Sequence, residues 1–183
     1  STTEFDQLVA LNNDPNTINF YIVNNSIEYS GKAGGITNRN LVIRGTDAIS
    51  FISAHELGHC FNLFHTFQGT KPFTNGCAKL PNNSNCSICG DYVCDTPADS
   101  GSGTVNGYSP DITNIMSYYG NSNHFSILQG ERMRNAINGS PLLASIKSTQ
   151  CNKITGPNVI CTTANFNYAF SNPNNINVIW SLT

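Results

Sequence analysis

The sequence predicts an α/β (α+β) domain that is followed by a β-rich tail. Two short apolar runs, residues 18–23 and 41–43, are typical of strands. Residues 47–61 and 127–137 carry apolar side chains at helical spacing. Residues 66–109 contain turn signals with almost no periodicity, and a loop of that length in a small domain is usually functional or held by bonds.

The remaining elements are predicted from local signals. Residues 3–12 have helical spacing, and Asn12-Asn13-Asp14-Pro15 ends that helix. Residues 31–35 are predicted as a turn or an irregular edge segment, and Asp47 as the N-cap of the second helix. Residues 154–183 alternate polar and apolar side chains, as two or three antiparallel strands would. We therefore expect one α/β domain in residues 1–150 and a β-rich tail in residues 151–183. The opening of that tail, residues 154–161 (ITGPNVIC), resembles the start of an immunoglobulin-like β module.

Composition excludes some classes of partner and favours an oxidising compartment. The net charge is −2 and no Lys/Arg cluster is present, which argues against a nucleic-acid partner. No apolar run approaches the length of a membrane span. Seven cysteines in a small domain favour secretion. We expect Cys60 to be a buried free thiol and the four cysteines in residues 77–94 to form disulfides, with all three pairings open.

His55-Glu56-Leu57-Gly58-His59 carries the chemistry of the chain. Residues four apart share a helix face, so His55 and His59 can bind one metal ion, and Glu56 lies close enough to act as a general base. Catalytic zinc has three protein ligands, and His65 supplies the third. On a continuous helix His65 would lie roughly 240° away from His59. The helix must therefore end between them, and Asn62 is suited to a left-handed helix terminus.

Two coincidental histidines on an exposed helix would also produce the bare five-residue motif. Three of the four histidines, however, fall within eleven residues, and the third follows a plausible helix stop. The sequence therefore predicts a catalytic zinc site rather than a chance match.

Several further segments resemble the pappalysin (cytophagalysin) family of metzincin zinc proteases. The resemblance covers about residues 18–139, and its segments are His65-Thr66-Phe67, residues 90–97 (GDYVCDTP), residues 114–118 (NIMSY) and residues 129–133 (QGERM). It implies a catalytic domain split by a cleft. The upper half has a twisted sheet and the zinc helix, and the lower half is irregular up to a C-terminal helix. Met116 then corresponds to the methionine turn beneath the zinc, and Tyr118 is placed to stabilise the oxyanion.

The resemblance also implies secretion as a zymogen with a propeptide, and often bound calcium. Asp91, Asp95 and Thr96 concentrate hard oxygen ligands, and the carbonyl of Cys94 could complete a calcium shell. The alternative is that Asp95-Thr96-Pro97 is only a turn. Some relatives have an acidic residue that selects basic substrates shortly after the tyrosine. The corresponding region here, with Tyr119 and Asn121 as candidate pocket residues, has no carboxylate, which puts a preference for Arg or Lys in doubt.

The sequence thus predicts a secreted zinc endopeptidase that cleaves proteins or peptides, and it does not indicate an oligomeric state. One alternative is a catalytically weak zinc-binding module of a larger adhesive protein. The other is a zinc hydrolase of small peptides.

Overall fold

The computed structural model describes residues 2–24, 28–147, 154–155 and 169–170. The chain divides into two compact units, Ser1–Lys147 and Ser148–Thr183. In the second unit, the described strands β4 (Ile154–Thr155) and β5 (Ala169–Phe170) pair antiparallel. The rest of the expected β module, with Cys151 and Cys161, lies outside the described residues.

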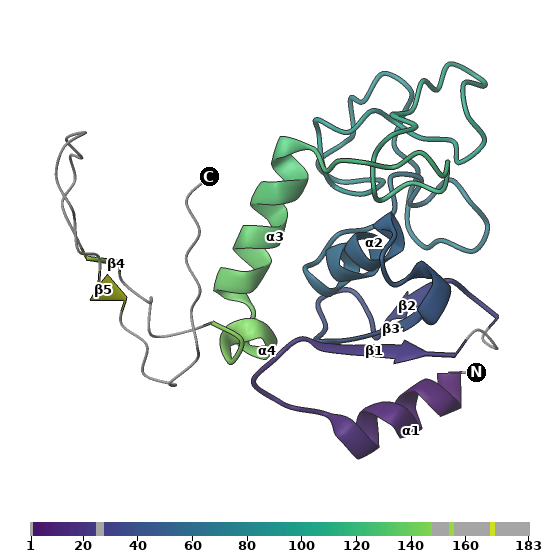
Figure 1. Ribbon diagram of the computed structural model, residues 1–183. Coiled ribbons are helices and arrows are strands. Elements are labelled where there is room, and N and C mark those ends of the chain that lie inside the picture. The colour runs from purple at the N-terminus through teal and green to yellow at the C-terminus, as the bar shows by residue number, and fades with distance from the viewer. Residues whose placement is uncertain (1, 25–27, 148–153, 156–168, 171–183) are drawn as a thin grey trace, which may run out of the picture. The chain divides into compact units, whose positions relative to one another are not determined.

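A three-stranded mixed sheet forms one layer of the first unit (Figure 1). Its strands are β1 (Asn19–Val23), β2 (Gly31–Ala33) and β3 (Asn40–Arg44), in the order β1-β3-β2. β1 runs parallel to β3, and β2 runs antiparallel to it. The two predicted strands are confirmed. Residues 31–35 were predicted as a turn or an irregular edge segment. Residues 31–33 do lie at the edge of the sheet, but they pair regularly with β3, so the expected turn is wrong there.

Helices pack on both faces of this sheet. Leu41 and Ile43 point to one face, where they form a core with Cys60 of α2 (Phe51–Cys60). Val42 points to the opposite face, in register with Tyr21, because side chains alternate along a strand. Tyr21 meets Phe5 of α1 (Thr2–Asn12), with the ring centroids 6.5 Å apart. The helix predicted over residues 3–12 is therefore confirmed.

The start of α2 differs from the sequence-based expectation. Asp47 was predicted as the N-cap, but it lies in a short 3-10 helix, η1 (Gly45–Asp47), and its carboxylate pairs with Arg44 at 2.7 Å. Ser50 caps α2 instead, since its side chain accepts a hydrogen bond from the Ile52 amide. An N-cap serine in extended backbone satisfies one of the free amides of the first turn.

α2 ends where the sequence predicts. Asn62 has a φ of +74°, in the left-handed region. The amide of Leu63 then bonds back to the carbonyl of Gly58 at 2.9 Å, which closes the helix end. Arg132 binds the same turn by donating from its Nε to the Asn62 carbonyl at 2.7 Å. The chain thus reverses immediately after the helix.

Long loops follow α2 and lie on its side away from the sheet (Figure 1). Disulfides Cys77–Cys89 and Cys86–Cys94 connect them, which resolves the pairing left open by the sequence, and Cys60 is a buried free thiol as expected. The predicted helix over residues 127–137 is confirmed as α3 (Ile127–Gly139), with a capping box between Ser126 and Gln129. A short helix not predicted from the sequence, α4 (Pro141–Ala144), follows it. The described helices include none long and apolar enough to cross a bilayer.

The backbone of Asn62 generates the first prediction. Asn62→Ala should lower the free energy of unfolding of the zinc-loaded protein by about 1–2 kcal/mol, because a Cβ-bearing residue without a local hydrogen-bonding side chain is strained at positive φ. Asn62→Gly is the matched control and should remain close to wild type, since glycine adopts this conformation freely. Urea denaturation measures both, and an equal loss in the two variants would contradict the backbone argument.

Candidate metal centre and cleft

The three predicted histidines converge on one point. His55 and His59 extend from α2, and His65 follows the chain reversal at Asn62. The Nε2 atom of His65 lies 3.2 Å from that of His55 and 3.1 Å from that of His59. A tetrahedral zinc ion with Zn–N bonds of about 2.0–2.1 Å separates its ligand atoms by roughly 3.3 Å. These two distances are close to that value, and the three ligand atoms all lie within 4.8 Å of one another, so the three rings could hold one ion.

Backbone carbonyls orient the two helical histidines. Nδ1 of His55 lies 2.6 Å from the Ile115 carbonyl, and Nδ1 of His59 lies 2.7 Å from the Leu63 carbonyl. A carbonyl can only accept, so each Nδ1 carries the proton and each Nε2 keeps its lone pair for a metal.

Burial keeps these imidazoles neutral. Burial, together with a smaller contribution from the neighbouring His59, lowers the pKa of His55 to about 4. Burial and the two other histidines lower the pKa of His65 to about 2. Neutral imidazole is the form that binds zinc, so the electrostatics of the cluster favour a metal ion over protons.

Glu56 extends from α2 toward the edge strand β2. Its Oε2 accepts a hydrogen bond from the Ala33 amide of β2 at 2.7 Å. Burial raises the pKa of Glu56 to about 7, although the Ala33 hydrogen bond opposes this rise. The strand approaches so closely because residue 31 is glycine, where an added Cβ would lie 2.8 Å from the Glu56 Cγ. The sequence analysis did not assign this role to Gly31.

Met116 packs against α2, the helix that carries His55 and His59. Its side chain is fully buried, and a Cβ added to Gly58 of α2 would lie 2.6 Å from its sulfur. The Met116 carbonyl accepts from the Thr66 amide at 3.1 Å, which ties the turn to the residue after His65. The segment that contains Met116 is therefore bonded to the first histidine, through the Ile115 carbonyl, and to the residue that follows the third.

Helix α3 anchors this turn through a pair of buried amides. Asn114 donates to the Gln129 Oε1 at 2.9 Å, and Gln129 donates back to the Asn114 Oδ1 at 3.1 Å. The same Asn114 oxygen accepts from the Met116 amide at 2.9 Å. Both residues belong to segments that carry the family resemblance, but their pairing is a long-range contact that the sequence does not reveal.

Tyr118 and Tyr119 point to different surroundings. Tyr118 is 64% exposed, and its ring centroid lies 4.8 Å from that of His65. The Tyr119 hydroxyl instead donates to Asp99 at 2.7 Å and accepts from the Gly103 amide. Asp99 is buried and also accepts a hydrogen bond from the Thr66 hydroxyl, so it fixes the position of the chain next to His65. The sequence analysis did not identify Asp99.

Two cavities flank Glu56. One of about 420 Å³ is lined by Lys32, Ala33, His65 and Phe73, among others. The other, of about 270 Å³, is lined mainly by neutral side chains, including Tyr29, Phe51 and Ile52. Gly31, Glu56 and Tyr118 belong to both. Tyr119 and Asn121, the candidate pocket residues, line neither. A larger cavity of about 590 Å³ beside α3 contains none of the three histidines.

Each of the four residues expected to bind calcium takes part in contacts within the chain. Asp95 bonds to Ser126 and to the Leu128 amide at the start of α3. Cys94 is in a disulfide, and its carbonyl accepts from Asn83. Asp91 and Thr96 are buried together and bind the Lys79 side chain.

The contact between Gly58 and Met116 generates the second prediction. Gly58→Ala should lower the free energy of unfolding by about 1–3 kcal/mol, because the added methyl group overlaps the buried sulfur. Gly130→Ala in α3 is the matched control. There the nearest atom to an added Cβ, in the Arg134 side chain, is 3.6 Å away, and alanine should stabilise the helix by up to about 1 kcal/mol. Urea denaturation of the zinc-loaded variants tests both, and a stable Gly58→Ala variant would refute the packing argument.

Comparison with known proteins agrees with this geometry. Residues 44–138 match the Peptidase M43 family, described as pregnancy-associated plasma protein-A. An extracellular metalloprotease of Neurospora crassa is 41% identical over 76 residues, which is 41% of this chain and 19% of that protein. An extracellular metalloprotease of Sordaria macrospora is 40% identical over 76 residues, with the same coverage. The match therefore spans about a fifth of the length of these relatives. Because the family match covers more than half of the 183 residues and includes the three histidines, the chain belongs to the Peptidase M43 family of metalloproteases, the pappalysin family that its motifs predict.

Proposed function

We propose that this protein is a secreted zinc-dependent endopeptidase, with His55, His59 and His65 as zinc ligands and residues 1–150 as its catalytic domain. The observation that carries the proposal is the convergence of three neutral imidazoles beside a buried carboxyl group. The two fungal relatives are named extracellular metalloproteases, and the disulfides fit an oxidising compartment.

A bound zinc ion supplies a water of lowered pKa and a Lewis acid for the scissile carbonyl. At this position Glu56 would take the proton of the attacking water and pass it to the leaving amine, while the water oxygen bonds to the scissile carbonyl carbon and the C–N bond breaks. A carboxyl group whose pKa lies near neutrality can both accept and release a proton at neutral pH. The Tyr118 hydroxyl donates a hydrogen bond to the carbonyl oxygen as negative charge develops on it.

The cleft fits a polypeptide that continues in both directions. Its two cavities meet at Gly31, Glu56 and Tyr118, so substrate residues can lie on either side of the cleaved bond. β2 forms an edge of the sheet and lines the cleft, and an exposed strand edge can pair with an extended peptide. The smaller cavity has Glu56 as its only acidic side chain, so we propose that it accepts an uncharged substrate side chain.

The base assignment generates the third prediction. Glu56→Gln should keep the zinc and lose several orders of magnitude in turnover of casein, because only the proton acceptor is removed. His65→Ala is the comparison variant and should lose the zinc itself. Zinc content by atomic absorption and product analysis by mass spectrometry separate the two effects. Internal cuts are expected, whereas release of single terminal residues would indicate a peptidase of another class. Near-normal turnover of Glu56→Gln would refute the role of Glu56, and an inactive wild-type protein with bound zinc would favour a binding module.

Tyr118 generates the fourth prediction. Tyr118→Phe should lower kcat roughly 10–1000-fold with little change in KM, since a single oxyanion donor acts in the transition state. Tyr119→Phe is the matched control. Its hydroxyl binds Asp99 outside the two cavities, so its loss should mainly affect stability. Steady-state kinetics on one peptide decide the matter, and an effect of Tyr118→Phe on KM alone would count against the oxyanion role.

A further inference from the structure

The most buried cationic side chain in the described part of the chain belongs to a lysine in the long loops between α2 and α3. The side chain of Lys79 is 1% exposed, and so is that of its partner Asp91. A charge removed from water in this way is tolerated only when it is paired and fully hydrogen-bonded. The surroundings of the Lys79 ammonium group therefore indicate what the site is built to hold.

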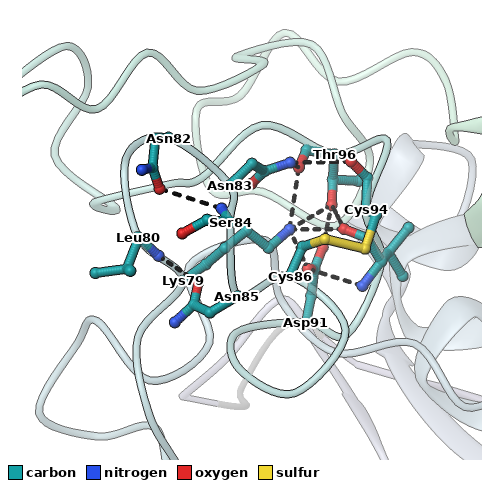
Figure 2. The surroundings of a disulfide bond; sticks show 11 residues. Lys79, Leu80, Asn82, Asn83, Ser84, Asn85, Cys86, Asp91, Cys94 and Thr96 are labelled. Atoms are coloured by element: carbon teal, nitrogen blue, oxygen red, sulfur yellow. Dashed lines mark hydrogen bonds and ion pairs between the residues drawn. A yellow bond between two sulfur atoms is a disulfide. The ribbon is translucent and has the colours of Figure 1, made fainter.

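Four oxygen atoms from three residues surround the Lys79 Nζ, as Figure 2 shows. They are the Asp91 Oδ1 at 2.5 Å, the Val93 carbonyl at 2.7 Å, and the Thr96 hydroxyl and carbonyl at 2.8 and 3.0 Å. A carboxylate, two backbone carbonyls and a hydroxyl are the ligand types that a calcium ion takes. We call this set the cation cage.

The cage is held in place independently of the lysine. Thr96 donates to the second oxygen of Asp91 at 2.6 Å, which orients its hydroxyl lone pairs toward Lys79. Asn83 donates to the carbonyls of Cys94 and Thr96, and the Cys86–Cys94 disulfide crosses the same loop. These contacts hold the oxygen atoms of the cage and do not involve Lys79.

The charge and distances of the cage fit an ammonium group and not a calcium ion. Contacts of 2.5–3.0 Å are those of charge-assisted hydrogen bonds, whereas calcium binds oxygen at about 2.3–2.6 Å with six to eight ligands. A single carboxylate neutralises one ammonium charge, and a divalent ion would leave the buried site positive. A calcium ion would also repel the Lys79 ammonium that occupies the same space.

Neighbouring segments fix the position of the Lys79 backbone beside the cage. Gly90 has a φ of +68°, and a Cβ added there would lie 2.8 Å from the Cβ of Lys79. Tyr108 donates to the Lys79 carbonyl at 3.2 Å. The lysine backbone is therefore in contact with two other segments, and its side chain is buried.

We propose that the Lys79 ammonium group takes the place of a calcium ion at Asp91 and Thr96, two of the four residues expected from the sequence to bind one. The lower half of the domain then folds around a cation that belongs to the chain itself. The wild-type cage has no affinity for calcium, and removal of the ammonium group converts the cage into a cation site.

The test compares melting temperatures of zinc-loaded proteins in calcium-free buffer during titration with calcium chloride, with magnesium chloride as the ion control. For the wild type we expect no saturable rise. Lys79→Met keeps the apolar part of the side chain but removes the ammonium group, so the buried Asp91 carboxylate loses its positive partner. Its melting temperature should fall without calcium and rise saturably with it, by about 5–10 °C at a hundredfold excess over Kd.

Lys79→Met/Asp91→Asn is the matched control. It lacks both charges, so calcium should not raise its melting temperature. The proposal is overturned if calcium stabilises the wild type saturably and Asp91→Asn abolishes that effect, because the cage would then already bind calcium. A folded Lys79→Met variant that does not respond to calcium overturns it as well. If Lys79→Met can be refolded only in the presence of calcium, the proposal is supported, and if it never folds, the wild-type titration decides.

Discussion

The metal centre depends on the reversal of the chain directly after α2. A helix can present two histidines on one face, but a third ligand six residues later reaches the same point only if the helix stops. The positive φ of Asn62 produces that stop, and the bond from Leu63 to Gly58 closes it. The Leu63 carbonyl then orients His59. One backbone conformation thus ends the helix, directs the third ligand and sets the tautomer of the second.

The second constraint is the packing of two layers against α2. On one side, the Ala33 amide of β2 donates a hydrogen bond to Glu56. On the other side, the Ile115 carbonyl binds His55, and Met116 packs against Gly58. Both approaches require a glycine, Gly31 on the strand and Gly58 on the helix. Glu56 and His55 extend from α2 and are therefore oriented by backbone groups of segments distant in the sequence.

Local patterns made much of this predictable from the sequence. The spacing of the histidines, the left-handed Asn62 and the apolar periods of β1, β3 and α3 are all properties of short segments, and the structure confirms these elements. The predictions that differ involve competing contacts. Asp47 is a good N-cap residue by type, but Arg44 binds its carboxylate and Ser50 caps the helix. Asp99, Gln129 and Lys79 act through partners 14 to 33 residues away, and no periodicity reports such contacts.

The cation cage has a consequence for how the protein responds to its surroundings. A bound ion exchanges with solvent, so it can be diluted away or captured by a stronger chelator, whereas a lysine side chain has no dissociation equilibrium. Its effective concentration at the cage is fixed by the covalent chain. If Lys79 takes the place of calcium as proposed, the loops that follow α2 do not respond at this position to the calcium level of the medium. The three histidines are then the group within the described residues that could hold an exchangeable metal ion.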